Sequence, residues 1–200
     1  MNKLLISLLV SLGITGVAHA AGDPAAGQQK TAVCAACHGA DGNSIAPNFP
    51  KLAGQNENYL FKQLKEIKGG MRTVPEMTGM LDAMSEQDLA DIAAYFASRS
   101  VQIGQASADL VAAGEAIYRA GVAEKGLAAC TACHAPNGQG NNAARFPALT
   151  GQNATYIESS LKKFAASERS NDPSGMMRDI AVKLSDAEIK AVAQYIQGLY

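Results

Sequence analysis

The chain has 200 residues, of which 48% are hydrophobic and 18% charged, and its 17 basic and 18 acidic side chains give a formal net charge of −1. This composition is typical of a globular protein and excludes a disordered chain. The near balance of charge excludes the basic surface of a nucleic-acid-binding protein, so we expect no nucleic-acid partner.

The first 20 residues predict a secretory signal peptide. Lys3 supplies a basic start, residues 4–17 are mostly apolar, and residues 18–20 (Ala-His-Ala) form a small-x-small cleavage site. A membrane anchor is the alternative, but the apolar stretch is short and is interrupted by serine, glycine and threonine. We therefore expect cleavage after Ala20 and export.

The remainder of the chain contains one pattern twice. A Cys-x-x-Cys-His motif occupies residues 34–38 and again 130–134. A Phe-Pro-x-Leu-x-Gly-Gln-Asn segment follows it at residues 49–56 and 146–153. Because so many matches occur in the same order, we interpret the halves as tandem domains.

The repeat also predicts the domain boundaries. We expect a signal peptide at residues 1–20, a first domain at 21–100, a linker at 101–107 and a second domain at 108–200. The linker assignment depends on a polar segment between the halves that lacks helical periodicity.

Each half is predicted to be mostly helical. Asp23-Pro24 is typical of a helix start and predicts a helix that runs into Cys34. Asn56 can cap a helix that ends at the Gly69-Gly70 pair. Ser85 and Ser185 each begin a capping-box pattern before the last helix of their half. No segment shows convincing period-2 alternation, so the fold class is all-α.

Four roles can be compared for the cysteines. Disulfides suit an exported protein, but Cys-x-x-Cys pairs on a helix make poor structural bridges. A Cys₄ zinc site prefers pairs that are closer in sequence, and a thioredoxin-like redox pair needs a βαβ context that is absent. In covalent c-type haem attachment, two thiols one helical turn apart meet the two vinyl groups, and the next residue projects onto the iron.

We favour the haem interpretation, with zinc and disulfide as the alternatives. It assigns two covalently bound haem c groups to the cysteine pairs Cys34, Cys37, Cys130 and Cys133. The iron ligands are then His38 and His134. A large apolar cofactor also completes the core of domains that are small for independent folding.

The repeat selects the second axial ligands from among the methionines. Met77 and Met177 fall on each other, eight residues before the capping serine of the last helix in each half. No other methionine of the exported chain has a methionine at its repeat position. If both domains use one ligation scheme, Met77 and Met177 bind the irons, and a slip to Met80 or Met176 is the alternative.

Together these segments resemble the dihaem cytochrome c4 family over the whole exported chain. The specific segments are HGADGN, PNFPKLAGQ, EMTGM and HAPNGQG. The resemblance implies two all-α cytochrome c domains related by pseudo-twofold symmetry, each wrapped around a covalent haem, with haem propionates near the domain interface. It also implies that the carbonyl groups of Pro50 and Pro147 accept the Nδ1–H of the proximal histidines.

The same resemblance implies a periplasmic carrier of single electrons between respiratory-chain partners, towards a terminal oxidase. Because histidine and methionine fill both axial positions, we expect outer-sphere electron transfer and no enzymatic activity. The alternatives are a dihaem electron-accepting subunit of a dehydrogenase, as in flavocytochrome c, and a dihaem peroxidase. We expect a monomer that docks weakly on redox proteins such as an oxidase, a quinol-oxidising complex or a dehydrogenase. Loose association with the membrane surface stays open.

Two smaller sets of residues are open to interpretation. The cations Lys62, Lys65, Lys68 and Arg72 form either a docking face or, as we favour, an ordinary solvated helix face. The tyrosines Tyr59 and Tyr156, or Arg72, either contact propionates or belong to the packing.

Overall fold

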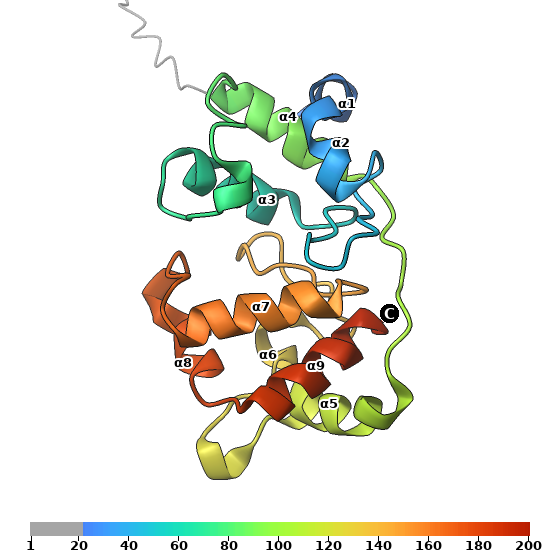
Figure 1. The fold of residues 1–200 in the computed structure, drawn as a ribbon, viewed down its shortest axis with the longest axis vertical. Coiled ribbons are helices and arrows are strands. Elements are labelled where there is room, and N and C mark those ends of the chain that lie inside the picture. Colours follow the sequence, from blue (N-terminus) through green and yellow to red (C-terminus); the bar gives the residue numbers. More distant parts are fainter. Residues whose placement is uncertain (1–21) are drawn as a thin grey trace, which may run out of the picture.

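The computed structural model describes residues 22–200, so the signal peptide predicted at residues 1–20 lies outside the described part. Two groups of helices stand one above the other, and an extended segment along one side joins them (Figure 1). The first group comprises α1 (Pro24–Lys30), α2 (Ala32–His38), α3 (Glu57–Lys68), η1 (Pro75–Met77) and α4 (Glu86–Ala97). The second comprises α5 (Ala108–Ala120), η2 (Ala123–Lys125), α6 (Thr131–His134), α7 (Ala154–Ala165), η3 (Pro173–Gly175), α8 (Met176–Ala181) and α9 (Asp186–Gln197).

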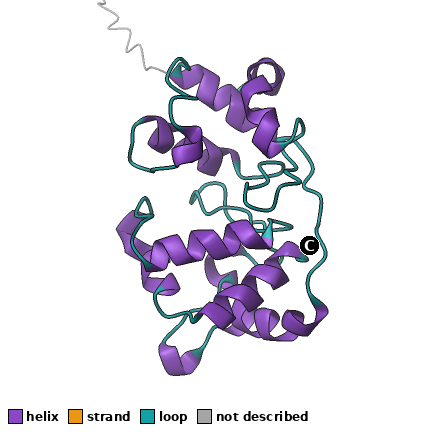
Figure 2. Cartoon of the chain, in the orientation of Figure 1, coloured by secondary structure: helices purple, strands orange, loops and turns teal. Residues whose placement is uncertain are grey.

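Helices and loops account for nearly the whole of this structure (Figure 2). Within residues 22–200 the only β-type pairings are two isolated bridges, Val122–Leu127, which encloses η2, and Asn141–Phe146. The all-α prediction is therefore confirmed. No helix in the described part is long and apolar enough to cross a bilayer.

The first and last helices of each half cross at a glycine. α1 packs on α4, and α5 packs on α9. A Cβ on Gly27 would lie 2.0 Å from the Asp91 carbonyl oxygen, and a Cβ on Gly114 would lie 2.2 Å from that of Ala191. Any side chain larger than hydrogen would push the helices apart, so the repeat retains glycine at both crossings.

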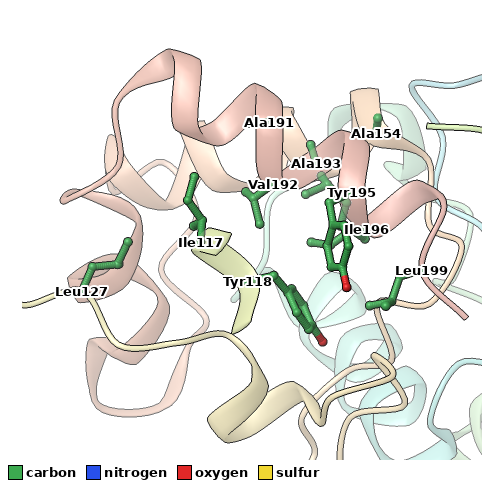
Figure 3. Close-up of a cluster of buried hydrophobic side chains, with 11 residues drawn as sticks. Ile117, Tyr118, Leu127, Ala154, Ala191, Val192, Ala193, Tyr195, Ile196 and Leu199 are labelled. Carbon is green, nitrogen blue, oxygen red and sulfur yellow. The ribbon is translucent and has the colours of Figure 1, made fainter. Parts of the chain in front are cut away.

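Each half has a small apolar core beside this crossing. In the second half, Tyr118 and Tyr195 pack with ring centroids 5.4 Å apart, next to Ile117 and Val192 (Figure 3). Leu60, Ile92 and Phe96 form the smaller core of the first half. Cys34 packs against the first core and Cys130 against the second, so the motif cysteines stand at the edge of the apolar interior.

Local signals predicted most helix ends correctly. The Asp23 side chain accepts from the Ala25 N–H at 2.8 Å, as expected of an N-cap. Ser85 and Ser185 both form complete capping boxes. The helix expected to run into Cys34 is instead two helices, because the Thr31 hydroxyl donates to the Gln28 carbonyl at 2.9 Å and its backbone leaves the helical register.

The helix after Asn56 begins and ends where predicted, but the Asn56 side chain does not cap it. Its Nδ2 instead donates to the carbonyl of Phe146 in the other half at 2.8 Å. The repeat-related Asn153 Nδ2 donates to the carbonyl of Phe49 at 2.9 Å. Both asparagines therefore contribute to the contact between the halves.

A second pair of contacts follows the same exchange. The Arg72 guanidinium donates to the Tyr156 hydroxyl at 3.1 Å, and that of Arg169 donates to the Tyr59 hydroxyl at 2.9 Å. Each arginine thus bonds the tyrosine of the opposite domain. Such reciprocal contacts are what a twofold relation between the halves produces, and the predicted pseudo-twofold arrangement is confirmed.

The solvated face predicted for the cations of α3 and Arg72 is partly wrong. Lys65 and Lys68 are largely exposed, but the Lys62 ammonium bonds Glu66 at 2.7 Å and the Asn171 carbonyl of the other half at 2.8 Å. Arg72 is likewise half-buried between the halves. Periodicity along a single helix could not reveal that a second domain covers this side.

Candidate functional site

The two Cys-x-x-Cys-His motifs lie on short helices that face the interior of their halves. In the first half α2 carries Cys34, Cys37 and His38. In the second half Cys130 is the N-cap of the four-residue helix α6, which ends at His134. In both, helical backbone places the two thiols about one turn apart and the histidine next to the second thiol.

The histidines are buried and held by the expected prolines. His38 Nδ1 lies 2.9 Å from the Pro50 carbonyl oxygen, and His134 Nδ1 lies 3.0 Å from that of Pro147. Because a carbonyl oxygen can only accept, Nδ1 carries the proton and the lone pair is on Nε2. Burial lowers the pKa of both imidazoles, although the bond to proline opposes this shift. Both rings are therefore neutral at pH 7 and suited to bind a metal through Nε2.

The cysteines differ in burial, since Cys133 is exposed and the other three are partly buried. None of the four, all within the described part, forms a disulfide. Burial raises the pKa of Cys34 and raises that of Cys130 to about 11. Within residues 22–200 no three or more His, Cys, Asp or Glu side chains converge on a point that could hold a metal ion. This arrangement does not support a Cys₄ zinc site.

One continuous cavity of about 1050 Å³ joins the two motifs. Its walls include the motif cysteines and histidines of both halves, together with core side chains such as Leu60 and Ile157. A large, mostly apolar cavity that brings thiols and a neutral imidazole to its wall fits a planar apolar cofactor attached through sulfur.

The methionines selected by the repeat also line this cavity. Met77 is the last residue of η1 and Met177 the second residue of α8, and both are half-buried. Met71, Met80 and Met176 line the same cavity. The cavity wall therefore offers several sulfur atoms, and the repeat register is the reason to choose Met77 and Met177.

Sequence reasoning missed Asp172, which fixes the start of α8. Its carboxylate accepts from the backbone N–H of Met177 at 2.9 Å and of Arg178 at 3.0 Å, and Arg178 Nε donates to it at 2.9 Å. These bonds hold the backbone of Met177 in place. The Asp172-Pro173 pair signals the start of the short helix η3, which precedes α8, but not the bonds of Asp172 to Met177 and Arg178.

Arg169 is a second residue that sequence reasoning missed. It lines the cavity together with Arg72, Tyr59 and Tyr156. The signal was present, because the offset that aligns Tyr59 with Tyr156 also aligns Arg72 with Arg169. Two guanidinium groups on the wall of this cavity are suited to carboxylates such as haem propionates. Both tyrosine hydroxyls accept hydrogen bonds from these arginines, which locates them in the polar wall.

Comparisons with known proteins agree with this geometry. The Cytochrome c family model matches residues 24–100 and, again, 111–200. The chain is 60% identical to cytochrome c4 of Pseudomonas aeruginosa over the full length of both proteins. It is 38% identical to a thiosulfate dehydrogenase electron acceptor of Thiomonas intermedia, with 86% of this chain and 81% of that protein covered.

A solved structure shows the same likeness in three dimensions. The crystal structure of reduced recombinant cytochrome c4 from Pseudomonas stutzeri superposes with a TM-score of 0.88 at 54% identity, covering 90% of this chain and all of that one. This chain contains two matched cytochrome c domains, and its relatives are cytochromes c4. Together these findings confirm the prediction of two covalently bound haem c groups.

Proposed function

Because the chain belongs to the cytochrome c4 family of dihaem electron-transfer proteins, we propose that it carries single electrons between respiratory-chain partners in the periplasm, towards a terminal oxidase. The single observation that carries the proposal is the duplicated set of two thiols, a neutral imidazole and a methionine on the wall of one cavity. When bound, each haem supplies a one-electron Fe(III)/Fe(II) couple.

The residue roles follow from the two sets of side chains. Cys34 and Cys37 hold one haem and Cys130 and Cys133 the other, through thioether bonds. The axial ligands are His38 with Met77 and His134 with Met177. The support for this assignment is the burial of the histidines, the helical spacing of the thiols and the repeat register of the methionines.

The prolines orient the histidines for this task. Pro50 and Pro147 fix the Nδ1–H tautomer, so that Nε2 points its lone pair away from the loop that holds the ring. A hydrogen bond from Nδ1–H also increases the electron density on the imidazole and its strength as a ligand.

The full set of axial ligands favours electron transfer over catalysis. With one histidine and one methionine on each iron, no position is left for a substrate such as peroxide. Histidine–methionine ligation also raises the reduction potential relative to other haem ligation, which suits a carrier that works towards an oxidase. We therefore propose that the protein is not an enzyme.

The export signal and the domain division complete the proposal. Residues 1–20 direct the chain to the periplasm and are removed, residues 21–100 and 108–200 each enclose one haem, and residues 101–107 link them. The absence of regular structure at residues 101–107 is consistent with this linker.

A second function has a specific observation in its favour. Two relatives, at 38% and 37% identity, are thiosulfate dehydrogenase electron acceptors. The chain could then accept electrons directly from a dehydrogenase, either as its subunit or as its diffusible acceptor.

Isolation of the tagged holoprotein at native abundance separates the two functions. A diffusible carrier is recovered as a single chain and, once reduced, is reoxidised by oxidase-containing membranes of the same cells. Recovery with a dehydrogenase in constant ratio supports the second function. Rapid turnover of hydrogen peroxide would contradict both.

A further inference from the structure

Each proximal histidine is connected through one peptide group to a glutamine of the other domain. The Pro50 carbonyl that accepts from His38 Nδ1 belongs to the Pro50–Lys51 peptide. The N–H of that same peptide donates to Gln152 Oε1 at 2.7 Å. The Gln152 amide in turn donates to the Lys51 carbonyl at 2.9 Å. Gln152 lies in the second domain and is 6% exposed.

The mirror arrangement is present in the second domain. The Pro147 carbonyl accepts from His134 Nδ1, and the N–H of the Pro147–Ala148 peptide donates to Gln55 Oε1 at 2.7 Å. Gln55 Nε2 donates to the Ala148 carbonyl at 2.8 Å, and Gln55 is 7% exposed. Each chain of hydrogen bonds thus ends at a buried glutamine of the opposite domain. Gln152 of the second domain serves His38, and Gln55 of the first domain serves His134.

A peptide group transmits polarisation from one end to the other. When its N–H donates to an oxygen, electron density shifts towards its carbonyl, which becomes a stronger acceptor. A stronger acceptor at Nδ1–H makes the imidazole a more basic ligand, and a more basic ligand stabilises the ferric over the ferrous iron. Because both glutamines are buried, water does not replace them as partners.

We propose that Gln152 and Gln55 are positioning residues that tune the opposite domain's haem: Gln152 lowers the reduction potential of the haem ligated by His38, and Gln55 lowers that of the haem ligated by His134. This inference rests on the proposed ligation by the two histidines. It makes the domain interface part of the electronic environment of each iron, beyond its role in holding the domains together.

One sequence difference breaks the symmetry of the arrangement. Lys51 corresponds to Ala148, and its buried ammonium donates to the carbonyl oxygens of Gly151 and Gln102. The peptide that contacts His38 is therefore held by an additional anchor that the peptide contacting His134 lacks. The two haems then differ in potential even though their ligand sets are the same.

The test is a crossed pair of variants in the intact holoprotein. Gln152→Leu should raise the potential of the first-domain haem, changing its reduction equilibrium constant by about threefold (~28 mV at 59 mV per tenfold), and should leave the second-domain haem unchanged. Gln55→Leu should do the reverse. Redox titration followed by NMR of the assigned haem methyl groups separates the two haems.

A matched control removes an interdomain contact that does not reach these peptides. Within residues 22–200, Asn58 bonds Asn142 across the interface, its N–H donating to Oδ1 at 2.9 Å and its Nδ2 to the carbonyl oxygen at 3.1 Å. Asn58→Ala should move neither potential. Equal shifts of both haems in Gln152→Leu, or no shift in either glutamine variant, would overturn the proposal.

A second variant and a second signal keep the test decisive. Gln152→Glu retains an oxygen that can accept from the Lys51 N–H, so the potential of the first-domain haem should not rise in it. In the reduced protein, the amide proton of Lys51 and the Nδ1 proton of His38 should both move upfield in Gln152→Leu. If the wild-type Nδ1 proton shows no haem ring-current shift, the proposed histidine ligation fails, which is a different result from an unshifted potential.

Discussion

Asp91 is a buried carboxylate that ties the ends of the first domain together. It is 3% exposed and accepts from the Asp23 N–H at 2.9 Å, from Lys30 Nζ at 2.6 Å and from Gln87 Nε2 at 2.8 Å. The bond from Asp23 and that from Lys30 hold its pKa below 3.8. The corresponding residue of the second domain is Ala191, so only the first domain has this anchor.

We expect Asp91→Asn to lower the free energy of unfolding of the first domain by about 2 kcal/mol at pH 7, because it removes a charged acceptor from buried donors. Since the folded-state pKa is depressed, this stability is fully present above the unfolded value near 3.8 and is lost as pH falls through the folded pKa. Guanidinium titrations at several pH values should therefore show wild type and variant converging in acid. A difference that stays constant down to pH 2 would show that the depressed pKa of Asp91 does not contribute to stability.

The methionine assignment has a spectroscopic test. A ferric haem with a methionine ligand shows a weak near-infrared sulfur-to-iron charge-transfer band. Met77→Leu and Met177→Leu should each remove one of the two bands, while the control variants Met80→Leu and Met176→Leu should retain both. If Met80→Leu lost a band while Met77→Leu kept both, Met80 would be the ligand in place of Met77. The same comparison decides between Met176 and Met177.

Single residues were predictable where chemistry fixes their spacing. Two thiols and an imidazole must follow one another on a helix to attach a haem, so Cys34, Cys37 and His38 are recognisable without a structure. Asp172 and Arg169 were not recognised, because their roles depend on groups brought near by folding. An acidic residue before a proline, or an arginine in a loop, is common in many unrelated settings.

At the scale of helices, the two glycine crossings set how closely the first and last helices approach. We expect Gly27→Ala and Gly114→Ala each to lower the free energy of unfolding of their domain by about 1–3 kcal/mol, because the added methyl group overlaps a backbone carbonyl. Differential scanning calorimetry measures the effect. Ala116→Leu is the control, since it enlarges an exposed position of α5. Equal stability in the glycine variants would show that the crossing can relax.

The helices themselves were largely predictable because their signals are local. Capping boxes at Ser85 and Ser185 and the glycines after α3 mark ends that neighbouring residues decide. The predictions failed where a side chain had a competing partner. The Thr31 hydroxyl bonds a backbone carbonyl and the first helix ends there. The Asn56 side chain bonds a carbonyl of the other domain and does not cap α3.

At the scale of the whole molecule, polar contacts that are buried or half-buried join the domains. The Arg169 guanidinium donates across the interface to the Tyr59 hydroxyl at 2.9 Å and to Gln63 Oε1 at 3.2 Å. We expect Arg169→Met to lower the free energy of interaction between the domains by about 1.5–3 kcal/mol, because the acceptors in the first domain lose a charged donor. Calorimetry should then resolve two transitions in place of one. The exposed pair of Arg119 and Glu115 offers a control, and Arg119→Met should keep the wild-type profile.

The repeat alone implied two equivalent domains, and the family resemblance added their pseudo-twofold arrangement. Neither revealed that Lys62 and Arg72 are covered, nor that a glutamine from each domain bonds the peptide behind the other domain's histidine. Those contacts join residues about 100 positions apart, and no pattern within one half encodes them.

Potentiometric titration of the purified holoprotein, followed in the visible and near infrared, distinguishes a dihaem electron carrier from a haem enzyme. We expect two haems per chain that each take up one electron, and a methionine-to-iron charge-transfer band in both ferric haems. Addition of hydrogen peroxide should produce no turnover. A ferric haem without that band, together with rapid peroxide consumption, would instead identify an open catalytic iron and rule out a pure electron carrier.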